Sequence, residues 1–472
     1  MKTYELVIIG GGSAGMAAAL EAKKCGIESI LVIERGPELG GVLLQCIHNG
    51  FGIKEFNEEL SGPEYAQRFI NQMKTSGINY ITNSMVLKLG RDKSVVYSNE
   101  SDGRQTIQAK AIILATGCRE RTCGSLTIPG SRPAGIWSAG TAQRYINIDG
   151  MMIGRRAFIL GSGDIGLIMA RRMTLEGAKV LGVAEIMPYS KGLPRNIMQC
   201  LKDFDIPLYL KHTIVKIEGK HRLKAVTIGE VNEQFKPIAN TEQRFECDTL
   251  LISAGLIPEN TLFEEADISL DGKTRGALVD EYLQTDIPGI FSCGNSLHVH
   301  DIVDNVTAEA RKAGHNAAVY IKSQNLAREG INAAFTIQPA KALQTSLSSN
   351  TMTCIVCPNG CELHIGESEF GREPVILGNK CPRGRQFALD ELTKPVRTLT
   401  TTVAIKNSTI KRLPVISSSP LPKNKVLEVR NLLEKITVDA PINVGQPVLK
   451  NALNLSIDII ATREATALKN NE

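Results

Sequence analysis

The chain has 472 residues, 43% hydrophobic content and a net charge of +5, a composition typical of globular proteins. Its length predicts about three domains. No apolar run reaches the roughly 18 residues that a membrane-spanning helix needs, and the sequence leaves no room for a signal peptide at its start. No block of like charges points to nucleic acid. Eleven cysteines, an odd number, favour metal or redox chemistry in a cytoplasmic protein over disulfides.

The chain begins with a pattern that predicts a dinucleotide site. An apolar run at 5–9 predicts a buried parallel strand, which leads through a glycine motif into a helix over 16–24. In such a unit the first glycine makes the turn, the second admits a pyrophosphate and the third packs helix against strand. A strand at 30–34 ends in an acid, the residue type that binds a ribose. The candidate residues are Gly10, Gly12, Ser13, Ala14, Gly15, Glu34 and Arg35.

The same pattern returns in the middle of the chain. A predicted strand at 157–160, a glycine motif, a helix over 167–176 and a strand at 180–185 follow one another. The first glycine precedes the acid by 24 positions in both copies. A single glycine motif is weak evidence, but two copies in full strand–turn–helix–strand context predict two nucleotide sites. The second set of candidates is Gly161, Gly163, Asp164, Ile165, Gly166 and Glu185.

Further segments complete a resemblance. Apolar strands precede the turns at 115–117 and at 255, and the segment 285–295 leads into a helix from about 303. In this order, these elements resemble the two-dinucleotide-binding-domain flavoproteins of the pyridine nucleotide–disulfide oxidoreductase superfamily. The resemblance covers residues 1 to about 325 and implies FAD at the first motif and NAD(P)H at the second. It adds these candidate cofactor residues: Gly41, Val86, Ala115, Thr116, Gly117, Gly255, Gly294 and Asn295.

The resemblance implies an α/β fold with two Rossmann-like domains, the NAD domain being inserted into a discontinuous FAD domain. A small β-rich cysteine-cluster domain would follow at the C-terminal end. Asn295 stands where the family usually has Asp, which keeps a hydrogen-bonding group without its charge. Glu185 favours NADH over NADPH, because a carboxylate there accepts a ribose hydroxyl and repels a 2′-phosphate. The expected boundaries are 1–120 with 246–325 (FAD), 121–245 (NAD), 326–350 (linker), 351–395 (four-cysteine module) and 396–472 (small β-rich domain).

The cysteine positions disfavour thiol–disulfide chemistry. The segment after the first unit offers only Cys46, and the segment 137–143 before the second glycine motif has no cysteine. Cys118 and Cys123 lie on the crossover into the second domain, where we do not expect them to face the flavin. The four candidate catalytic residues beside the flavin are Cys46, His48, His298 and His300. The alternative is that these thiol and imidazole groups are structural.

Four cysteines near the C-terminal end predict an inorganic centre. Cys354, Cys357 and Cys361 are closely spaced, and Cys381 follows after 19 residues. This spacing suits four thiolate ligands and favours a [4Fe–4S] cluster over zinc, the alternative occupant. It is similar to the N-terminal cluster-binding segment of molybdopterin oxidoreductases. The residues at 396–472 predict a β-rich domain with a helix over 426–435, whose role the sequence leaves open.

The whole chain resembles a fusion of components of anaerobic FAD-dependent glycerol-3-phosphate dehydrogenase systems. That resemblance implies an NADH-linked subunit beside a separate FAD-dependent dehydrogenase, within an oligomer or hetero-complex. We therefore expect an FAD-dependent NADH:acceptor oxidoreductase, or its reverse, that exchanges electrons with a partner through the cluster. One alternative is a stand-alone NADH oxidase or peroxidase that uses Cys46 as a sulfenic-acid centre, with structural zinc. Another is a non-catalytic assembly subunit.

Overall fold

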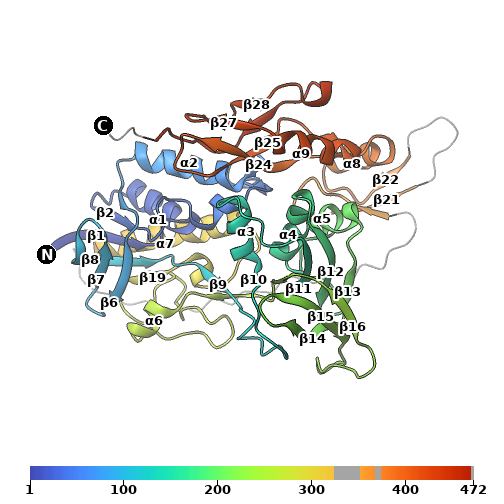
Figure 1. Cartoon of the computed structure of the whole chain (residues 1–472). Coiled ribbons are helices and arrows are strands. Elements are labelled where there is room, and N and C mark those ends of the chain that lie inside the picture. The colour runs from blue at the N-terminus through green and yellow to red at the C-terminus, as the bar shows by residue number, and fades with distance from the viewer. Residues whose placement is uncertain (324–350, 367–373, 469–472) are drawn as a thin grey trace. The chain divides into compact units, whose positions relative to one another are not determined.

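The computed structural model describes residues 1–323, 351–366 and 374–468 (Figure 1). The chain divides into two compact units, each assembled from two separate stretches of sequence. The first unit comprises 1–119 and 256–340, and the second comprises 120–255 and 341–472. The linker predicted at 326–350 lies outside the described residues.

A seven-stranded sheet lies at the centre of the first unit. Its central strands are parallel, because β1 pairs in parallel with both β2 and β8. The strands β6, β7 and β8 form an antiparallel meander at one edge. In spatial order the sheet contains β5 (Asn79–Ile81), β2 (Ile30–Ile33), β1 (Lys2–Ile9), β8 (Gly103–Leu114), β7 (Ser94–Asn99) and β6 (Met85–Leu89), with β19 (Ile290–Ser292) paired to the end of β8.

This sheet is covered on both faces. Alternate residues of β1 enter two different hydrophobic cores, with Leu6 and Ile8 on one face and Val7 and Ile9 on the other. Helices α1 (Ser13–Lys24), α2 (Gly62–Thr75) and α7 (Val303–Ser323) cover the first face, and α6 (Thr261–Glu265) packs with the meander on the second (Figure 1). Burial on both faces explains why the central strands are almost wholly apolar.

The first part of the second unit repeats this plan. Its five-stranded sheet is entirely parallel. Helices α3 (Ala139–Asn147), α4 (Asp164–Leu175) and α5 (Pro194–Cys200) cover one face, and an antiparallel sheet of β14 (His212–Gly219), β15 (Leu223–Glu230) and β16 (Gln243–Glu246) covers the other. The parallel strands, in spatial order, are β10 (Ile136–Ser138), β17 (Thr249–Ile252), β11 (Arg156–Leu160), β12 (Lys179–Glu185) and β13 (Leu208–Leu210).

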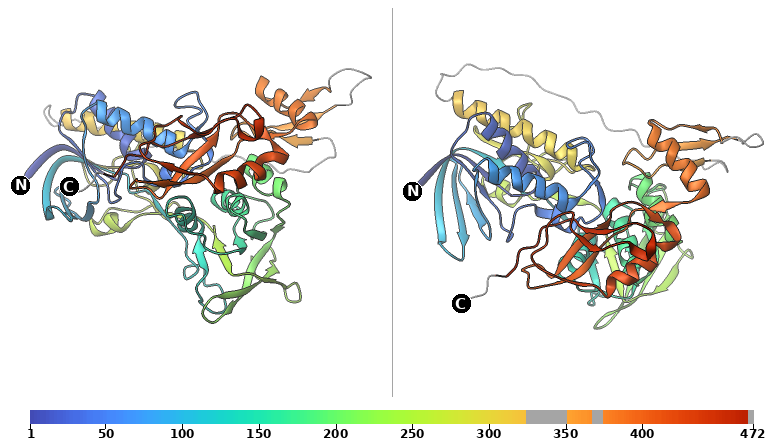
Figure 2. Two further views of the ribbon diagram at one scale, coloured as in Figure 1. Left: turned by 45° about the horizontal axis from the view of Figure 1, so that its top comes forward. Right: turned by 90° about the horizontal axis from the view of Figure 1, so that it is seen from above.

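The C-terminal part of the second unit has two modules (Figure 2). The four cysteines belong to a small module of β20 (Thr351–Thr353), β21 (Glu362–Ile365), β22 (Ile376–Leu377) and α8 (Pro382–Thr393). The second module is a five-stranded sheet on which α9 (Val426–Glu434) packs. Its strands, in spatial order, are β27 (Thr437–Asp439), β24 (Thr400–Lys406), β25 (Arg412–Ser417), β29 (Ile459–Ala461) and β28 (Pro447–Leu449).

Short two-stranded pairs complete the described strands. They are β3 (Asn49–Phe51) with β4 (Leu60–Ser61), β9 (Cys118–Glu120) with β18 (Leu256–Pro258), and β23 (Val396–Arg397) with β26 (Leu421–Pro422).

Both dinucleotide-motif helices begin earlier than the sequence predicts. Helix α1 starts at Ser13 rather than at residue 16, and α4 starts at Asp164 rather than at residue 167. The N-cap is the second glycine of the motif in each case, Gly12 or Gly163. The last residues of the motif therefore form the first helical turn, whose backbone N–H groups have no partner within the helix.

Buried charges join the C-terminal sheet to helix α4 within the second unit. Glu176, just after α4, pairs with Arg172 one turn earlier and with Arg430 on α9, whose Nη2 lies 2.6 Å from the carboxylate. Leu175 enters the hydrophobic core of the C-terminal sheet. A second buried arginine, Arg397, pairs with Asp203 of the preceding part of the unit.

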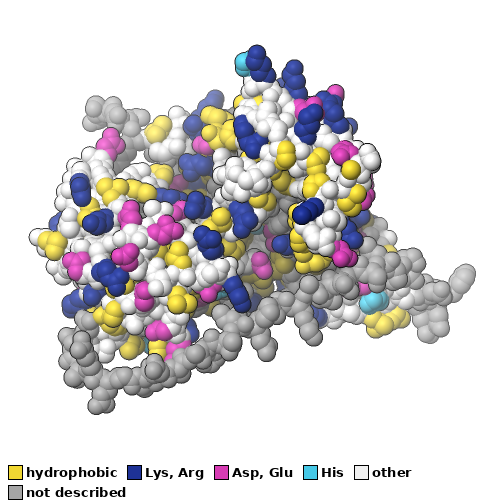
Figure 3. Space-filling model, turned by 90° about the horizontal axis from the view of Figure 1, so that it is seen from below, with side chains coloured by type: hydrophobic (Ala, Val, Ile, Leu, Met, Phe, Trp, Pro, Cys, Tyr) yellow, Lys and Arg dark blue, Asp and Glu magenta, His cyan; other side chains and the backbone are white. Residues whose placement is uncertain are grey.

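The surface carries mixed charges. Lys and Arg side chains alternate with Asp and Glu over the face shown in Figure 3, in keeping with the small net charge of +5. Among the described helices, none is long and apolar enough to cross a membrane.

We predict that Glu176→Gln destabilises the protein strongly. Removing one partner of a buried ion pair costs about 3–5 kcal/mol, because the other charge stays buried without compensation. Thermal unfolding should therefore occur at a clearly lower temperature. The matched control is Glu434→Gln, which removes an exposed carboxylate from the same Arg430 and should cost less than about 1 kcal/mol. Equal shifts in the two variants would contradict the role assigned to Glu176.

The contribution of Glu176 should also depend on pH. Burial alone would raise its pKa, but Arg172 and Arg430 outweigh burial and hold the pKa below the ordinary value of 4.5. Its stabilising contribution is therefore complete at pH above 4.5 and is lost as the pH falls through the lower folded-state value. Denaturant titrations across this range should show the difference between wild type and Glu176→Gln shrinking towards acid pH.

Candidate functional site

The first glycine motif makes a close backbone contact with the end of β8. Gly10 has a φ of 109°, and a Cβ there would lie 2.3 Å from the carbonyl oxygen of Ala115. A Cβ at Gly15 would lie 1.8 Å from the carbonyl oxygen of Gly10, so the helix packs directly on the turn. A Cβ at Gly12 would meet nothing within 4 Å. The space beside Gly12 is therefore open at the N-terminus of α1, where a phosphate binds.

The second glycine motif has the same geometry. A Cβ at Gly161, which has a φ of 99°, would lie 2.2 Å from the carbonyl oxygen of Ser253, just after β17. A Cβ at Gly166 would lie 2.6 Å from the carbonyl oxygen of Gly161. A Cβ at Gly163 would have its nearest neighbour, the Ser253 hydroxyl, at 3.7 Å. Each motif thus combines two glycines required by close packing with one that borders open space.

Glu34, directly after β2, holds the first motif. Its carboxylate is buried and accepts hydrogen bonds of 2.7 Å from the backbone N–H groups of Gly11 and Gly36. The two oxygens therefore bridge the glycine turn and the turn after β2. The predicted contact of Glu34 with a ribose remains a prediction, for which each oxygen keeps a further lone pair.

Glu185 makes the equivalent contacts in the second motif. Its Oε2 accepts hydrogen bonds from the backbone N–H and the hydroxyl of Ser162, at 3.0 and 2.7 Å, and its Oε1 accepts one from Met187 N–H at 3.0 Å. The side chain is buried. A negative charge is thus fixed beside the second turn, as the expected preference for NADH over NADPH requires.

Cys46 and His48 follow a turn at residues 40–41 of the first unit. Gly40 N–H donates to the carbonyl oxygen of Gly11, and a Cβ at Gly41 would lie 3.1 Å from the Cα of Gly12. This turn therefore lies against the first glycine motif. Burial raises the pKa of the Cys46 thiol to about 12, which keeps it protonated at neutral pH and weakens it as a nucleophile. His48 contacts the carbonyl oxygen of Asn49 at 3.2 Å.

The two histidines near the start of α7 meet at one carboxylate, which the sequence did not lead us to expect. Glu309 accepts a 2.7 Å hydrogen bond from Gly294 N–H and lies 3.3 Å from Nε2 of His300 and 3.6 Å from Nδ1 of His298. Burial lowers the pKa of His298, and Glu309 offsets this only in part, so the ring is neutral at pH 7. An acid on the helix that follows two histidines was the only available signal.

Asn295 lies beside Cys118. Its Nδ2 is 3.6 Å from the Cys118 sulfur, and its Oδ1 accepts a 3.0 Å hydrogen bond from His300 N–H. The reason is tertiary, since residues 118 and 295 come together only when β8 and β19 pair. Our expectation that Cys118 does not face the flavin stays a prediction.

The remaining predicted cofactor residues fall into three groups. Ser13, Ala14 and Ile165 lie in the first turns of the two motif helices, and Asp164 accepts hydrogen bonds of 2.7–2.8 Å from Leu193 N–H and Asn196 Nδ2. Val86 is buried in the core on β6, so only its backbone could reach a ligand, and Arg35 is exposed. Thr116 and Gly117 lie in the turn after β8, and Gly255, which has a φ of 103°, lies in the turn after β17.

The four C-terminal cysteines gather at one end of their module. Cys354 N–H donates to the carbonyl oxygen of Cys361 at 2.8 Å, and Cys381 is the N-cap of α8. Burial raises the pKa of the Cys354 thiol, and the nearby sulfurs of Cys357, Cys361 and Cys381 raise it further. A hydrogen bond from Gly384 N–H and the neighbouring Arg383 lower the pKa of Cys381. These mutual effects require all four sulfurs to lie near one another.

We call these four cysteines the cysteine cage. Their sulfurs lie near enough to one another to affect the pKa of Cys354, and four thiolates suit either an iron–sulfur cluster or zinc.

The cysteine loop rests on helix α5 of the same unit. A Cβ at Gly360, which has a φ of 52°, would lie 3.1 Å from the Cβ of Pro194. Pro194 opens α5 directly after Leu193, whose N–H binds Asp164 of the second glycine motif. A short series of direct contacts thus connects the predicted nucleotide motif with the loop that carries Cys357 and Cys361.

Comparison with known proteins gives two family matches. Residues 4–317 match the model of the pyridine nucleotide-disulphide oxidoreductase family. Residues 382–463 match a family described as a protein of unknown function, DUF1667, which begins directly after Cys381.

Similar curated proteins include a hydrogen cyanide synthase subunit and a thioredoxin reductase. Hydrogen cyanide synthase subunit HcnB of Pseudomonas protegens is 27% identical over 61% of this chain and 65% of its own length. The chain therefore spans a little under two thirds of that relative. Thioredoxin reductase of Listeria monocytogenes is 27% identical over 68% of this chain and 95% of its own length.

Solved structures show the same fold. Thioredoxin reductase of T. acidophilum aligns with a TM-score of 0.56 and 21% identity, covering 69% of this chain and 100% of its own. The NAD-dependent persulfide reductase of A. fulgidus aligns with a TM-score of 0.51 and 17% identity, covering 88% of this chain and 70% of its own. The expected α/β fold of two Rossmann-like domains with a β-rich C-terminal region is confirmed.

We predict that an alanine substitution has different effects at the closely packed glycine and at the open glycine of the second motif. Gly163→Ala should fold normally, because a Cβ there meets no close atom, but it should fill the space beside the helix N-terminus and raise the KM for NADH about tenfold. Gly161→Ala should lower the unfolding temperature, because its Cβ meets a backbone oxygen. Thermal unfolding and NADH titration of both variants test this. Normal NADH affinity in Gly163→Ala would contradict the assignment.

Proposed function

Because the chain belongs to the pyridine nucleotide-disulphide oxidoreductase family, we propose that it is an FAD-dependent NADH:acceptor oxidoreductase, or that it catalyses the reverse reaction. Its C-terminal cysteines hold an iron–sulfur cluster through which a partner dehydrogenase exchanges single electrons. Glycerol 3-phosphate is the candidate substrate of that partner. The observation that carries the proposal is the gathering of Cys354, Cys357, Cys361 and Cys381 in a chain with two nucleotide motifs.

The first motif fits FAD. The open space beside Gly12 admits a pyrophosphate at the N-terminus of α1, and Glu34 fixes the turn that presents the backbone N–H groups. Asn295 is the candidate group that hydrogen-bonds to the flavin. When bound, FAD and NADH supply hydride transfer between a flavin and a nicotinamide. The protein contributes binding, orientation and the polar groups around the two sites.

The second motif fits NADH. The open space beside Gly163 has the geometry of the space beside Gly12, and the buried carboxylate of Glu185 lies where a 2′-phosphate of NADPH would approach. The negative charges of this carboxylate and of a 2′-phosphate would repel each other in a partly buried site. The expected preference for NADH is therefore electrostatic.

The cysteines near the flavin site support chemistry without a dithiol. Desolvation raises the pKa of the half-buried Cys46 thiol to about 12, which disfavours the alternative of a sulfenic-acid oxidase or peroxidase. His298 and His300, held by Glu309, are the candidate groups that hold or release a proton beside Asn295.

The cysteine cage supports an iron–sulfur cluster over zinc. Three closely spaced cysteines with a fourth after 19 residues suit the corners of a cluster better than the paired knuckles of structural zinc, and Cys381 is the N-cap of a helix whose N-terminal N–H groups favour negative charge. Such a cluster supplies one-electron transfer, whereas zinc would supply only structure. A partner that takes single electrons is therefore part of the proposal.

We predict that Cys357→Ala impairs electron transfer to the partner but leaves reduction of the flavin by NADH intact. Anaerobically purified wild type should contain iron and sulfide together with flavin, and NADH should bleach the flavin. Cys357→Ala should lose most of its iron and at least tenfold of its electron transfer to the partner or to a one-electron acceptor, yet keep NADH-dependent flavin bleaching (a tenfold effect corresponds to about 1.4 kcal/mol).

The matched control is Cys200→Ala, which removes a buried thiol outside the cage and should keep both iron and transfer. Stoichiometric zinc, with a plain flavin spectrum in the wild type, would overturn the cluster. Loss of flavin bleaching in Cys357→Ala would overturn the separation of the two steps.

Cys46→Ala supplies an independent prediction. If Cys46 is only a buried thiol, the variant should keep turnover with NADH within about twofold of wild type, since the flavin reaction does not use the sulfur. Steady-state rates with NADH and an artificial acceptor test this, with flavin content measured in parallel. A rate loss of about a hundredfold at full flavin content would restore the sulfenic-acid alternative.

A further inference from the structure

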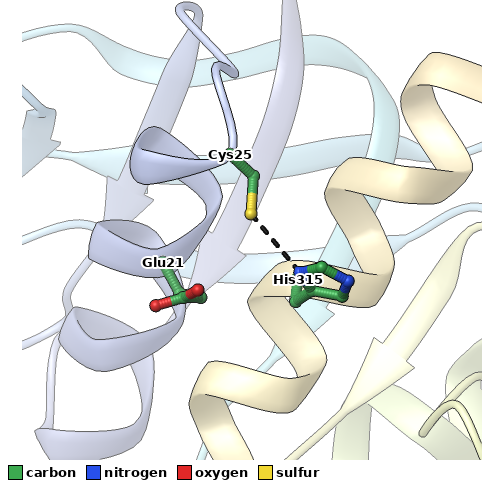
Figure 4. Close-up of side chains that lie close together, drawn as sticks. All are labelled: Glu21, Cys25 and His315. Carbon is green, nitrogen blue, oxygen red and sulfur yellow. Dashed lines mark hydrogen bonds between the residues drawn. The ribbon is translucent and has the colours of Figure 1, made fainter.

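Three metal-ligating side chains meet on helices α1 and α7 of the first unit, apart from both nucleotide motifs and from the cysteine cage. Glu21 and Cys25 lie one helical turn apart at the end of α1, and His315 lies on α7 (Figure 4). The Cys25 sulfur is 3.5 Å from Nδ1 of His315. A carboxylate oxygen of Glu21 joins them, with all three ligand atoms within 4.8 Å of one another.

Close helix packing fixes this arrangement. A Cβ at Gly314 would lie 2.3 Å from the carbonyl oxygen of Ala18, so α7 approaches the backbone of α1 directly before His315. The neighbouring Ala313 and Ala317 are fully buried at the same interface. The distance between Cys25 and His315 is therefore set by a rigid helix pair rather than by loops.

The carboxylate of Glu21 can turn towards the other two groups. Its nearest cations are Lys24 Nζ at 3.9 Å and Arg311 Nη1 at 3.7 Å, and both distances exceed that of a hydrogen bond. Arg311 is instead hydrogen-bonded to Glu55. A surface hollow lined in part by Leu20, Glu21 and Arg311 gives the carboxylate access to solvent.

The observed geometry matches that of a zinc site. Zn–S bonds of 2.3 Å and Zn–N bonds of about 2.05 Å, at a tetrahedral angle, put the sulfur and nitrogen about 3.6 Å apart. The separation of Cys25 Sγ and His315 Nδ1 is 3.5 Å. Thiolate, imidazole and carboxylate are all ligands that Zn²⁺ accepts. A fourth position would be left for water.

We propose that Glu21, Cys25 and His315 form a Zn²⁺ site that joins α1 to α7. Binding replaces the S–H bond of Cys25 by a Zn–S bond and releases the proton to solvent, with no change in oxidation state. Because α1 carries the first glycine motif and α7 follows Asn295, the ion stabilises the two helices that frame the predicted FAD site.

The test follows the reactivity of one cysteine in the full-length protein. Cys25 is alkylated with a maleimide, with and without zinc chloride, and its labelling rate is read by peptide mass spectrometry. This readout is independent of metal at the four-cysteine cage. We expect zinc to slow labelling of Cys25 at least tenfold and to raise the unfolding temperature, while the labelling rate of Cys118 stays unchanged.

The ligand assignment is tested by two variants and a control. His315→Gln and Glu21→Gln should lose most of the protection and most of the thermal shift, whereas His221→Gln, which removes an exposed histidine elsewhere, should retain both. Unchanged labelling of Cys25 in the presence of zinc overturns the site. Full protection in His315→Gln also overturns it, because zinc would then bind the thiol without the imidazole. Neither result affects the proposed electron transfer, whose test measures iron and flavin bleaching.

Discussion

Each glycine turn must touch the backbone of a strand that is remote in sequence. Gly10 lies against Ala115 and Gly161 against Ser253, at distances that leave no room for a Cβ. A buried acid at the end of the next strand, Glu34 in the first unit, then ties the turn in place through its carboxylate. The rest of the site follows from this contact, because it sets where the motif helix begins and leaves open space beside the middle glycine.

Both units contain this contact between a glycine turn and a remote strand. In the described residues, the second unit also contains the cysteine module and the C-terminal five-stranded sheet. The C-terminal sheet shares a core with α4 and is joined to it by Arg172, Glu176 and Arg430. Breaking such a buried pair is costly, so the C-terminal sheet is held firmly on α4. The cysteine loop reaches the second nucleotide motif through Pro194 and Asp164.

Seven of the eleven cysteines fall into three different environments. Cys46 and Cys200 are desolvated, and burial raises the pKa of each thiol to about 12. The four C-terminal cysteines face one another, and Cys381 has a lowered pKa because a backbone N–H and an arginine stabilise its thiolate. Cys25 is partly exposed beside an imidazole. The last two environments place other metal-ligating groups beside the sulfur, whereas the raised pKa of Cys46 and Cys200 disfavours the thiolate form that a metal requires.

The sequence by itself determined the strand–turn–helix units, the two dinucleotide motifs, the four-cysteine spacing and the β-rich C-terminal region. These features depend on local periodicity and on residues close together in the chain, such as Gly10 and Glu34. Only the tertiary structure decided which distant side chains meet. Glu309 joins His298 and His300 through the fold of α7, Cys118 meets Asn295 through the pairing of β8 with β19, and Cys25 meets His315 through helix packing. Such contacts leave no periodic signal, because they are fixed by the approach of whole elements rather than by neighbouring residues.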